Sequence, residues 1–132
     1  MMHYTISTEK EAQFIDITGL VQRAVAESGV EQGIALVFVP HTTAGVTINE
    51  NADPDVVHDL LLGLDRAFPK SPAYRHGEGN SHAHLKASAM GSSVTVLLEA
   101  GRLTLGTWQG IYFCEFDGPR QRQVYISVLA AT

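Results

Sequence analysis

The sequence predicts one α+β domain spanning residues 1–132, built around an antiparallel β-sandwich with a few flanking helices. Three observations favour this class. A chain of 132 residues is an ordinary length for one domain. Its last third reads as successive strand-like stretches separated by short turns. The helical stretches are too few and too irregularly spaced for a doubly wound parallel sheet.

The first third predicts two short strands, a helix and a buried strand. The short strands are expected at residues 3–7 and 14–17, and the buried strand at residues 33–40. Between them, apolar residues at helical spacing predict a helix over residues 18–28 that ends at Gly29, a residue type that readily adopts the left-handed conformation. These apolar residues are Leu20, Val21, Ala24 and Val25.

The middle third predicts a strand, two helices and a long loop. The strand is expected at residues 45–49 and the helices at residues 54–68 and 82–90. Asp53 is expected to cap the first helix, and Pro54 suits the first turn of that helix. Ser81 or Asn80 is expected to cap the second helix. The polar loop over residues 69–80 is long for a compact domain, which suggests a function.

The last third predicts four strands joined by tight turns. The strands are expected at residues 93–98, 102–105, 110–116 and 123–129. Ala100-Gly101 and Asp117-Gly118-Pro119 supply turn residues between them. Strands that follow one another through short turns pair in the antiparallel direction, which is the basis of the predicted fold class.

Composition excludes several classes of partner. The formal net charge is -5 and no segment concentrates lysine and arginine, so we expect no broad nucleic-acid interface, although a local anion pocket is compatible with this charge. The longest apolar run, residues 34–39, is too short to span a bilayer, and residues 1–11 lack the features of a secretory signal. We therefore expect a cytoplasmic protein with no membrane partner. Cys114, the single cysteine, lies in an apolar-aromatic stretch and is expected to be a buried side chain rather than a nucleophile.

Residues 76–86 form the most informative segment. They contain three of the six histidines, a carboxylate, an amide, a hydroxyl and a lysine around two glycines. Such groups are costly to bury unless they meet ligands, charges or hydrogen-bond partners. The segment therefore predicts a functional surface.

The histidines suggest a metal site. His41 follows a buried strand, and His76, His82 and His84 can approach it from the side of the long loop. Neutral imidazoles with an oxygen ligand suit a zinc-like ion with an open position, whereas the alternative is that each histidine is a surface or hydrogen-bonding residue. His82 and His84 are two residues apart, so on a helix they diverge by about 200° and are not joint ligands.

An anion site is the second candidate. Asn80 and Ser81 lie at the start of a predicted helix, where free N–H groups and the helix dipole favour phosphate, and Lys86 lies further along that helix. Arg120 can add a bidentate clamp. The alternative is that these residues only cap the helix and face solvent.

Carboxylates and one amide form the third candidate. Glu50 and Glu78 are flanked by polar residues and suit acid, base or metal-binding roles. Glu115 and Asp117 are two residues apart and can share one face of a strand, although Asp117 also suits a turn. Gln109 can address a polar edge of a ligand, and the neighbouring Trp108 is explained better by packing than by stacking on a substrate.

Five parts of the sequence, in this order, closely resemble the YjbQ-like family, also called the secondary thiamine-phosphate synthase family. They are HTTA at 41–44, NENADP at 49–54, EGNS at 78–81 with AHLK at 83–86, GTWQGI at 106–111 and EFDGPR at 115–120. The resemblance covers nearly the whole chain, and its GTWQ block is specific. Position 82 departs from the family pattern, in which an acidic residue is more usual.

The resemblance implies a sandwich-like α+β fold and a homotrimer with sites near subunit boundaries. It also implies a weak thiamine-phosphate synthase activity, which joins hydroxymethylpyrimidine diphosphate to thiazole phosphate and releases pyrophosphate. The substrate is then a small phosphorylated heterocycle, and the cofactor a divalent metal, zinc-like or magnesium. The expected catalytic residues are Glu78, Glu50, Glu115 and Gln109, and the expected phosphate-binding residues are Asn80, Ser81, Lys86 and Arg120. The expected metal ligands are His41 and His84, with His76, which lies outside the matched motifs, as a third.

Two other functions are compatible with these residues. One is a non-catalytic module that binds a metal or a phosphorylated metabolite. The other is metal-assisted hydrolysis of a phosphate ester, in which a metal-bound water replaces the thiazole as nucleophile. An enzyme loses turnover with its fold intact when Glu78 or His84 is replaced, whereas a binding module has no turnover to lose. A hydrolase differs from a synthase in its product, because it releases free pyrimidine alcohol without thiamine phosphate.

Overall fold

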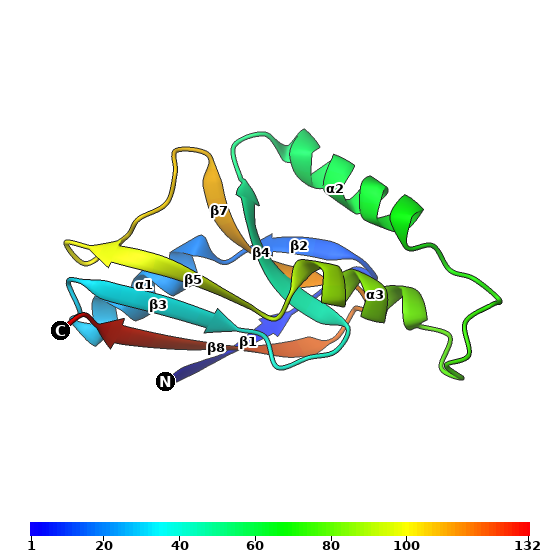
Figure 1. The fold of residues 1–132 in the computed structure, drawn as a ribbon, viewed down its shortest axis with the longest axis horizontal. Helices are drawn as coiled ribbons and strands as arrows, with labels where there is room; N and C mark the ends of the chain where they lie inside the picture. The colour runs from blue at the N-terminus through cyan, green and yellow to red at the C-terminus, as the bar shows by residue number, and fades with distance from the viewer.

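The computed structural model describes residues 1–132 and contains eight strands and three helices (Figure 1). In chain order the elements are β1 (Met2–Ser7), β2 (Gln13–Asp16), α1 (Thr18–Ser28), β3 (Gly33–Phe38), β4 (Ala44–Glu50), α2 (Pro54–Ala67), α3 (Ser81–Met90), β5 (Ser93–Glu99), β6 (Arg102–Leu103), β7 (Gln109–Glu115) and β8 (Gln121–Ala130). None of the three helices combines the length and the apolar character that a membrane-spanning helix requires.

The strands form two sheets in which every pair is antiparallel. The larger sheet has the order β1-β8-β3-β5-β6 and the smaller sheet has the order β2-β7-β4. The predicted α+β class with antiparallel sheets is therefore confirmed. Strands adjacent in space are often distant in sequence, since β3 pairs with β8 and β4 pairs with β7.

The main core lies between the larger sheet on one side and α1 with the smaller sheet on the other. On β3, Ala35 and Val37 point into this core, whereas the alternate residues Ile34 and Phe38 point outward. The core also takes Val21, Ala24 and Val25 from α1, Ile111 and Phe113 from β7, and Val124 and Ile126 from β8.

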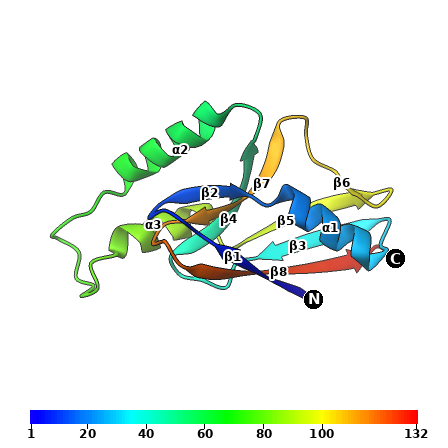
Figure 2. The same cartoon turned by 180° about the vertical axis from the view of Figure 1, so that it is seen from behind.

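The second face of the smaller sheet is covered by α3. Ala83 and Ala87 pack on Tyr112, Cys114 and Phe116, so β7 is buried on both faces apart from its first residue. By contrast, α2 has no buried residue. Figures 1 and 2 agree that α2 and α3 lie at the end of the molecule far from both chain termini.

The helix signals in the sequence are mostly confirmed. α1 ends at Gly29, which has a φ of 71°, and the Asp53 side chain accepts a hydrogen bond of 2.9 Å from the N–H of Asp55 at the start of α2. The expected cap of α3 is wrong in one respect, because the Asn80 side chain makes no capping bond and bonds Asp117 instead. The expected strand over residues 102–105 is shortened to β6, because the chain leaves the edge of the sheet to reach β7.

The packing of α3 on β4 depends on Gly45. A Cβ atom at this position would lie 2.6 Å from the carbonyl oxygen of Gly91, so α3 would have to move. We expect Gly45→Ala to lower the free energy of unfolding by about 1–3 kcal/mol, as overpacking does. The matched variant Gly63→Ala, in α2 where no atom lies within 4 Å of the added carbon, should instead raise it by about 0.5–1 kcal/mol. Urea denaturation of both variants checks this, and equal stability of the two would contradict the packing.

Candidate functional site

A polar cavity of about 630 Å³ lies where several chain segments leave the two sheets. Its walls come from the β3–β4 connection, the loop before α3, α3 itself, the β7–β8 turn and β8. It brings together six of the residues expected from the sequence: His41, His76, Glu78, Asn80, His84 and Arg120. Residues far apart in the chain therefore meet in one site.

A buried ion pair between Arg122 and Glu115 supports this cavity. Glu115 is fully buried and Arg122 is 3 % exposed. The Arg122 Nε donates to Glu115 Oε1 at 2.8 Å, and Nη2 donates to Glu115 Oε2 and to Thr43 Oγ1. The Thr8 hydroxyl and the N–H groups of Phe116 and Asp117 complete the shell around the carboxylate.

These contacts decide the charge state of Glu115. Burial alone would raise its pKa, but the hydrogen bonds from Arg122, from the N–H of Asp117 and from Thr8 outweigh burial and lower the pKa below its ordinary value. Glu115 is thus an anion that holds Arg122. It does not line the cavity, so it cannot touch a ligand there as a catalytic residue would.

The Arg122 guanidinium is not saturated by these bonds. Its Nε and Nη2 are engaged, whereas Nη1 makes no hydrogen bond and the side chain lines the cavity. Sequence reasoning missed Arg122. The sequence does contain a pattern that points to it: Arg122 lies two residues before Val124 and four before Ile126, so on a strand its side chain lies on the same inward face.

One ring nitrogen of His41 accepts a hydrogen bond from the backbone, which leaves the other nitrogen as an N–H donor. Its Nε2 accepts a hydrogen bond of 2.8 Å from the backbone N–H of Gln123, so the proton of the neutral ring lies on Nδ1. Burial, and next the positive charge of Arg122, lower the pKa of His41, which favours the neutral ring. The residue therefore supplies an N–H group.

Asp117 ties the long loop to the β7–β8 turn. Its carboxylate accepts hydrogen bonds from Asn80 Nδ2 at 2.9 Å and from Arg120 Nη2 at 3.0 Å, and its carbonyl accepts one from Arg120 Nε at 2.9 Å. The other amide atom, Asn80 Oδ1, is buried without a partner. This leaves a vacant acceptor on a residue that lines the cavity.

The imidazoles of the cavity do not form a coordinating set in this arrangement. The only lone pair of neutral His41 is engaged by Gln123, and the rings of His76 and His84 meet edge to face with centroids 5.4 Å apart. His76 lies beside Glu78, with Nε2 to Oε2 at 3.8 Å. No three His, Cys, Asp or Glu side chains anywhere in the chain are grouped to hold a metal ion.

Besides Glu115, four expected site residues lie outside this cavity. Glu50 and Gln109 pair with each other at the opposite end of β4 and β7, six residues from the Ala44–Glu115 pair, which corresponds to about 20 Å. Ser81 begins α3 without lining the cavity, and Lys86 lies in another pocket together with His82. The predicted divergence of His82 from His84 is confirmed.

Two further expectations concern single residues. Cys114 is fully buried, and burial raises its pKa far above the ordinary value, which agrees with a structural side chain. The expected packing of Trp108 is wrong within this chain, because its exposed fraction is 62 %. Its loop lies beyond the end of the smaller sheet, where no other part of the chain covers the ring.

The buried ion pair yields a stability prediction. Glu115→Gln leaves the Arg122 charge buried without a counter-ion, so we expect the free energy of unfolding at pH 7 to fall by about 3 kcal/mol or more. Glu27→Gln, at an exposed position, should change it by less than about 0.5 kcal/mol. Urea denaturation compares the two, and an unchanged midpoint for Glu115→Gln would contradict the role of this carboxylate.

The same pair predicts a pH dependence. Because the folded-state pKa of Glu115 lies below 4.5, its contribution is present above that value and is lost as the pH falls through the folded-state pKa. The acid-induced loss of stability of the wild type should therefore be reduced in Glu115→Gln.

Comparison with known proteins agrees with the fold and the motifs. Residues 2–131 match the family described as UPF0047 protein YjbQ-like. The chain is 54 % identical over 125 residues to the UPF0047 protein YugU of Bacillus subtilis, covering 94 % of this chain and 95 % of the relative. It is 50 % identical over 129 residues to a UPF0047 protein of Methanocaldococcus jannaschii, covering 98 % and 94 %.

Solved structures agree as well. An uncharacterised conserved protein of the YjbQ/UPF0047 family from Clostridium acetobutylicum is 61 % identical, with a TM-score of 0.96 and coverage of 98 % of this chain and 100 % of that one. A YbjQ-like protein of unknown function from Sulfolobus solfataricus P2 is 33 % identical, with a TM-score of 0.94 and coverage of 98 % and 96 %. The chain therefore belongs to the YjbQ-like UPF0047 family.

Proposed function

We propose that this protein is an enzyme that binds a small phosphorylated heterocycle in the cavity and carries out a transfer of the thiamine-phosphate synthase type. One observation carries the proposal: a buried guanidinium, fixed by Glu115, lines a polar cavity with a free N–H edge. Planar guanidinium groups match the oxygens of a phosphate, and the fixed position of Arg122 means that little rotamer freedom is lost on binding.

The neighbouring groups support an anionic ligand. The Nδ1–H of His41 adds a neutral donor, and Arg120 adds a second guanidinium at the rim, where it is half exposed. A leaving diphosphate gains negative charge as its bond to carbon breaks, so donors fixed in advance stabilise that step. Arg122 and His41 are therefore assigned to the phosphate groups.

Other groups suit the heterocycle. Asn80 Oδ1 can accept a hydrogen bond from a ring amino group, which would satisfy an acceptor that has no partner in the protein. In the proposed reaction the thiazole nitrogen forms a bond to the methylene carbon of the pyrimidine, while the carbon–oxygen bond to diphosphate breaks and its electron pair leaves with pyrophosphate. Glu78 and His84 at the cavity can exchange protons with the departing groups.

The activity prediction uses both substrates with Mg²⁺ as the counter-ion of the diphosphate. We expect thiamine phosphate and pyrophosphate in equal amounts, and a fall in kcat/KM of about 100-fold in Glu78→Gln and in Arg120→Ala. Arg23→Ala and Glu27→Gln, at exposed positions of α1, serve as matched controls that keep the activity. Product analysis by liquid chromatography, with circular dichroism as a check of folding, measures this.

Three results would overturn the synthase assignment. Free pyrimidine alcohol without thiamine phosphate would indicate a phosphate-ester hydrolase. Saturable binding of both substrates without any product would indicate a non-catalytic binding module. Full activity in Glu78→Gln and Arg120→Ala would show that the reaction does not take place in this cavity.

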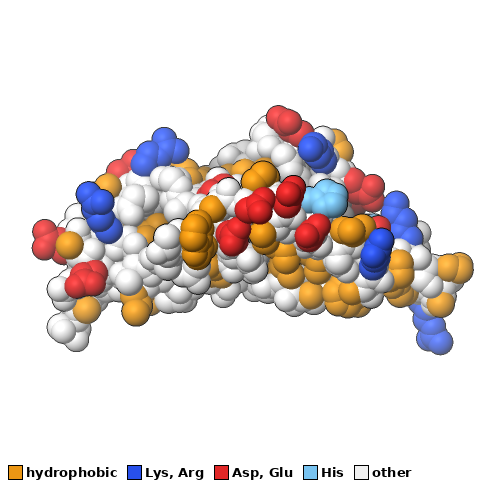
Figure 3. All heavy atoms as spheres, turned by 90° about the horizontal axis from the view of Figure 1, so that it is seen from above, with side chains coloured by type: hydrophobic (Ala, Val, Ile, Leu, Met, Phe, Trp, Pro, Cys, Tyr) orange, Lys and Arg blue, Asp and Glu red, His pale blue; other side chains and the backbone are white.

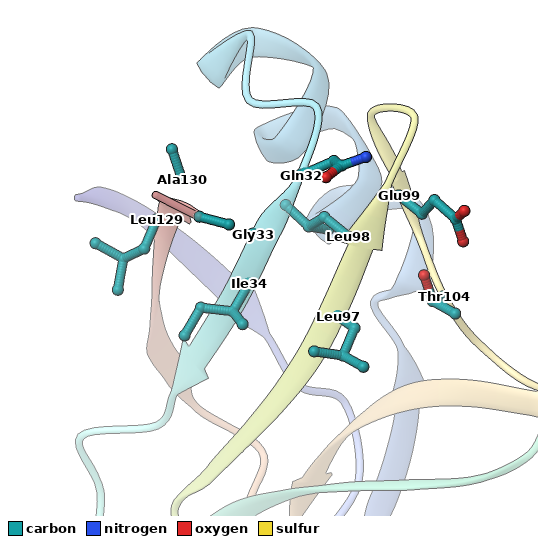
Figure 4. Close-up of a pocket in the computed structure, with 10 residues that line it drawn as sticks. Gln32, Gly33, Ile34, Leu97, Leu98, Glu99, Thr104, Leu129 and Ala130 are labelled. Atoms are coloured by element: carbon teal, nitrogen blue, oxygen red, sulfur yellow. The ribbon is translucent and has the colours of Figure 1, made fainter.

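We also propose that the active form is a homotrimer in which one subunit supplies Glu50 and Gln109 to the cavity of the next. The outer face of the larger sheet is apolar and uncovered: Ile34 pairs with both Leu97 and Leu129, forming a row across β5, β3 and β8 (Figure 4). Leu97 is 65 % exposed and Leu129 is 53 % exposed. An apolar row of this size suits burial against a second copy of the chain.

Two further observations support a second copy of the chain on this face: the face borders the cavity, and the two surfaces that would meet carry opposite charges. Phe38, on the same outer face, also lines the cavity, so a copy seated on this face would border the site. The end of the subunit that carries Glu50 and Gln109 is acidic, with Asp16, Asp53 and Asp55 exposed, whereas the cavity contains Arg120 and Arg122. Figure 3, seen from the α2 side, shows acidic side chains gathered on this face. The two surfaces are complementary in charge.

The trimer prediction is tested by complementation. Glu50→Gln and Glu78→Gln should each be inactive, but subunits mixed by co-refolding in equal amounts should regain activity in about one quarter of the sites, because some cavities then receive both wild-type residues. Mixing Glu78→Gln with Arg120→Ala, two variants of the same wall, should regain none. Light scattering gives the number of subunits independently of activity, and a monomer or an unrescued mixture would contradict the shared site.

A further inference from the structure

A second polar pocket lies on the other face of α3. Its volume is about 380 Å³, and it is bordered by α3, by the β1–β2 connection and by the end of α2 with the start of the long loop. Phe116 contributes an apolar wall. The polar residues around it are Glu11, Asp65, Lys70, His82 and Lys86.

Lys86 is the first group that this subunit leaves incompletely bonded. Its side chain is 6 % exposed, yet its ammonium group, which has three N–H donors, makes one hydrogen bond, to Asp65 Oδ1 at 3.0 Å. A buried ammonium is costly unless its donors are bonded. Lys86 therefore has donor capacity in a pocket that it lines.

His82 is the second such group. Its side chain is 7 % exposed, its Nδ1 is buried with no partner, and its Nε2 lies 3.5 Å from Glu11 Oε1. That separation exceeds the usual length of a strong charge-assisted hydrogen bond. Two polar side chains that are more than nine-tenths buried thus line one pocket, and neither is fully bonded.

The carboxylates of the pocket differ from these two groups in exposure. Glu11 and Asp65 are 59 % and 73 % exposed, so they lie toward the solvent and can move. The hydrogen bond from Lys86 lowers the pKa of Asp65, which keeps this carboxylate charged. The inner part of the pocket therefore carries the fixed cationic and N–H groups, and its mouth carries the mobile anions.

We propose that this pocket is a second anion site, which takes a small phosphate-bearing or similar oxyanionic ligand on Lys86 and His82. In its absence Asp65 and Glu11 occupy the positions of the anion, and they act as internal competitors that swing toward solvent when it binds. The flexible Lys70, at 3.3 Å from Glu11 Oε1, adds a third cation at the mouth.

This site is separate from the main cavity. His82 and His84 lie two residues apart on α3, so their side chains point in directions about 200° apart. The two pockets share no lining residue. The proposal therefore does not depend on the proposed function of the main cavity.

The test uses inorganic phosphate as the probe and the full chain as the protein. Histidine ring resonances are followed by NMR during a phosphate titration, with His82 assigned by the loss of its signal in His82→Gln. We expect a saturable shift of the His82 signal, which disappears in Lys86→Met. Arg120→Ala, in the main cavity, should leave the His82 response unchanged.

Asp65→Asn provides the deciding variant, because it alters an exposed residue and spares the buried ones. If Asp65 competes with the ligand, the dissociation constant for phosphate falls by about threefold or more when its charge is removed. If the Lys86–Asp65 pair only ties α2 to α3, the constant stays the same or rises. An unchanged or higher dissociation constant in Asp65→Asn would overturn the proposal, and so would a His82 response that never saturates. Neither measurement depends on whether Lys86→Met folds.

Discussion

The buried pair of Glu115 and Arg122 is the interaction on which the arrangement of the site depends. Two charges removed from water are stable only when their remaining donors and acceptors are bonded, and here Thr8 and Thr43 supply those bonds from two other connections of the chain. The hydrogen bonds to this ion pair therefore fix the end of β7 and the start of β8 relative to the β1–β2 and β3–β4 connections. A ligand that meets the free edge of Arg122 meets a group that is already in place.

The main cavity and the second pocket divide the polar groups of residues 76–86 between them. α3 is the dividing element: it packs through Ala83 and Ala87 on the smaller sheet and presents His84 on one side and His82 with Lys86 on the other. The small residues allow the helix to approach the sheet closely, so both sets of polar side chains lie against a rigid support. One short helix thus serves two pockets of different composition.

The uncovered surfaces of the chain show a second constraint. A chain of this size has one main core, between the larger sheet and the layer formed by α1 and the smaller sheet. The outer face of the larger sheet remains apolar around Ile34, and α2 has no buried residue. An apolar surface of this extent is a feature of faces that associate with another molecule.

The sequence by itself determined the elements and much of the wall of the cavity. Hydrophobic periodicity and turn residues depend on near neighbours in the chain, so α1 with its end at Gly29, and α2 with its Asp53 cap, were predictable. Polar residues such as Glu78 and His84 stood out because a core does not contain them.

Only the tertiary structure decided which of these residues meet. The role of Glu115 and the importance of Arg122 follow from contacts with distant segments, and the lone pair of His41 is engaged by a backbone N–H that lies 82 positions away in the chain. Local sequence patterns report the direction of a side chain on its own element. They do not report which strands are neighbours, and here the pairing of distant strands determines the site.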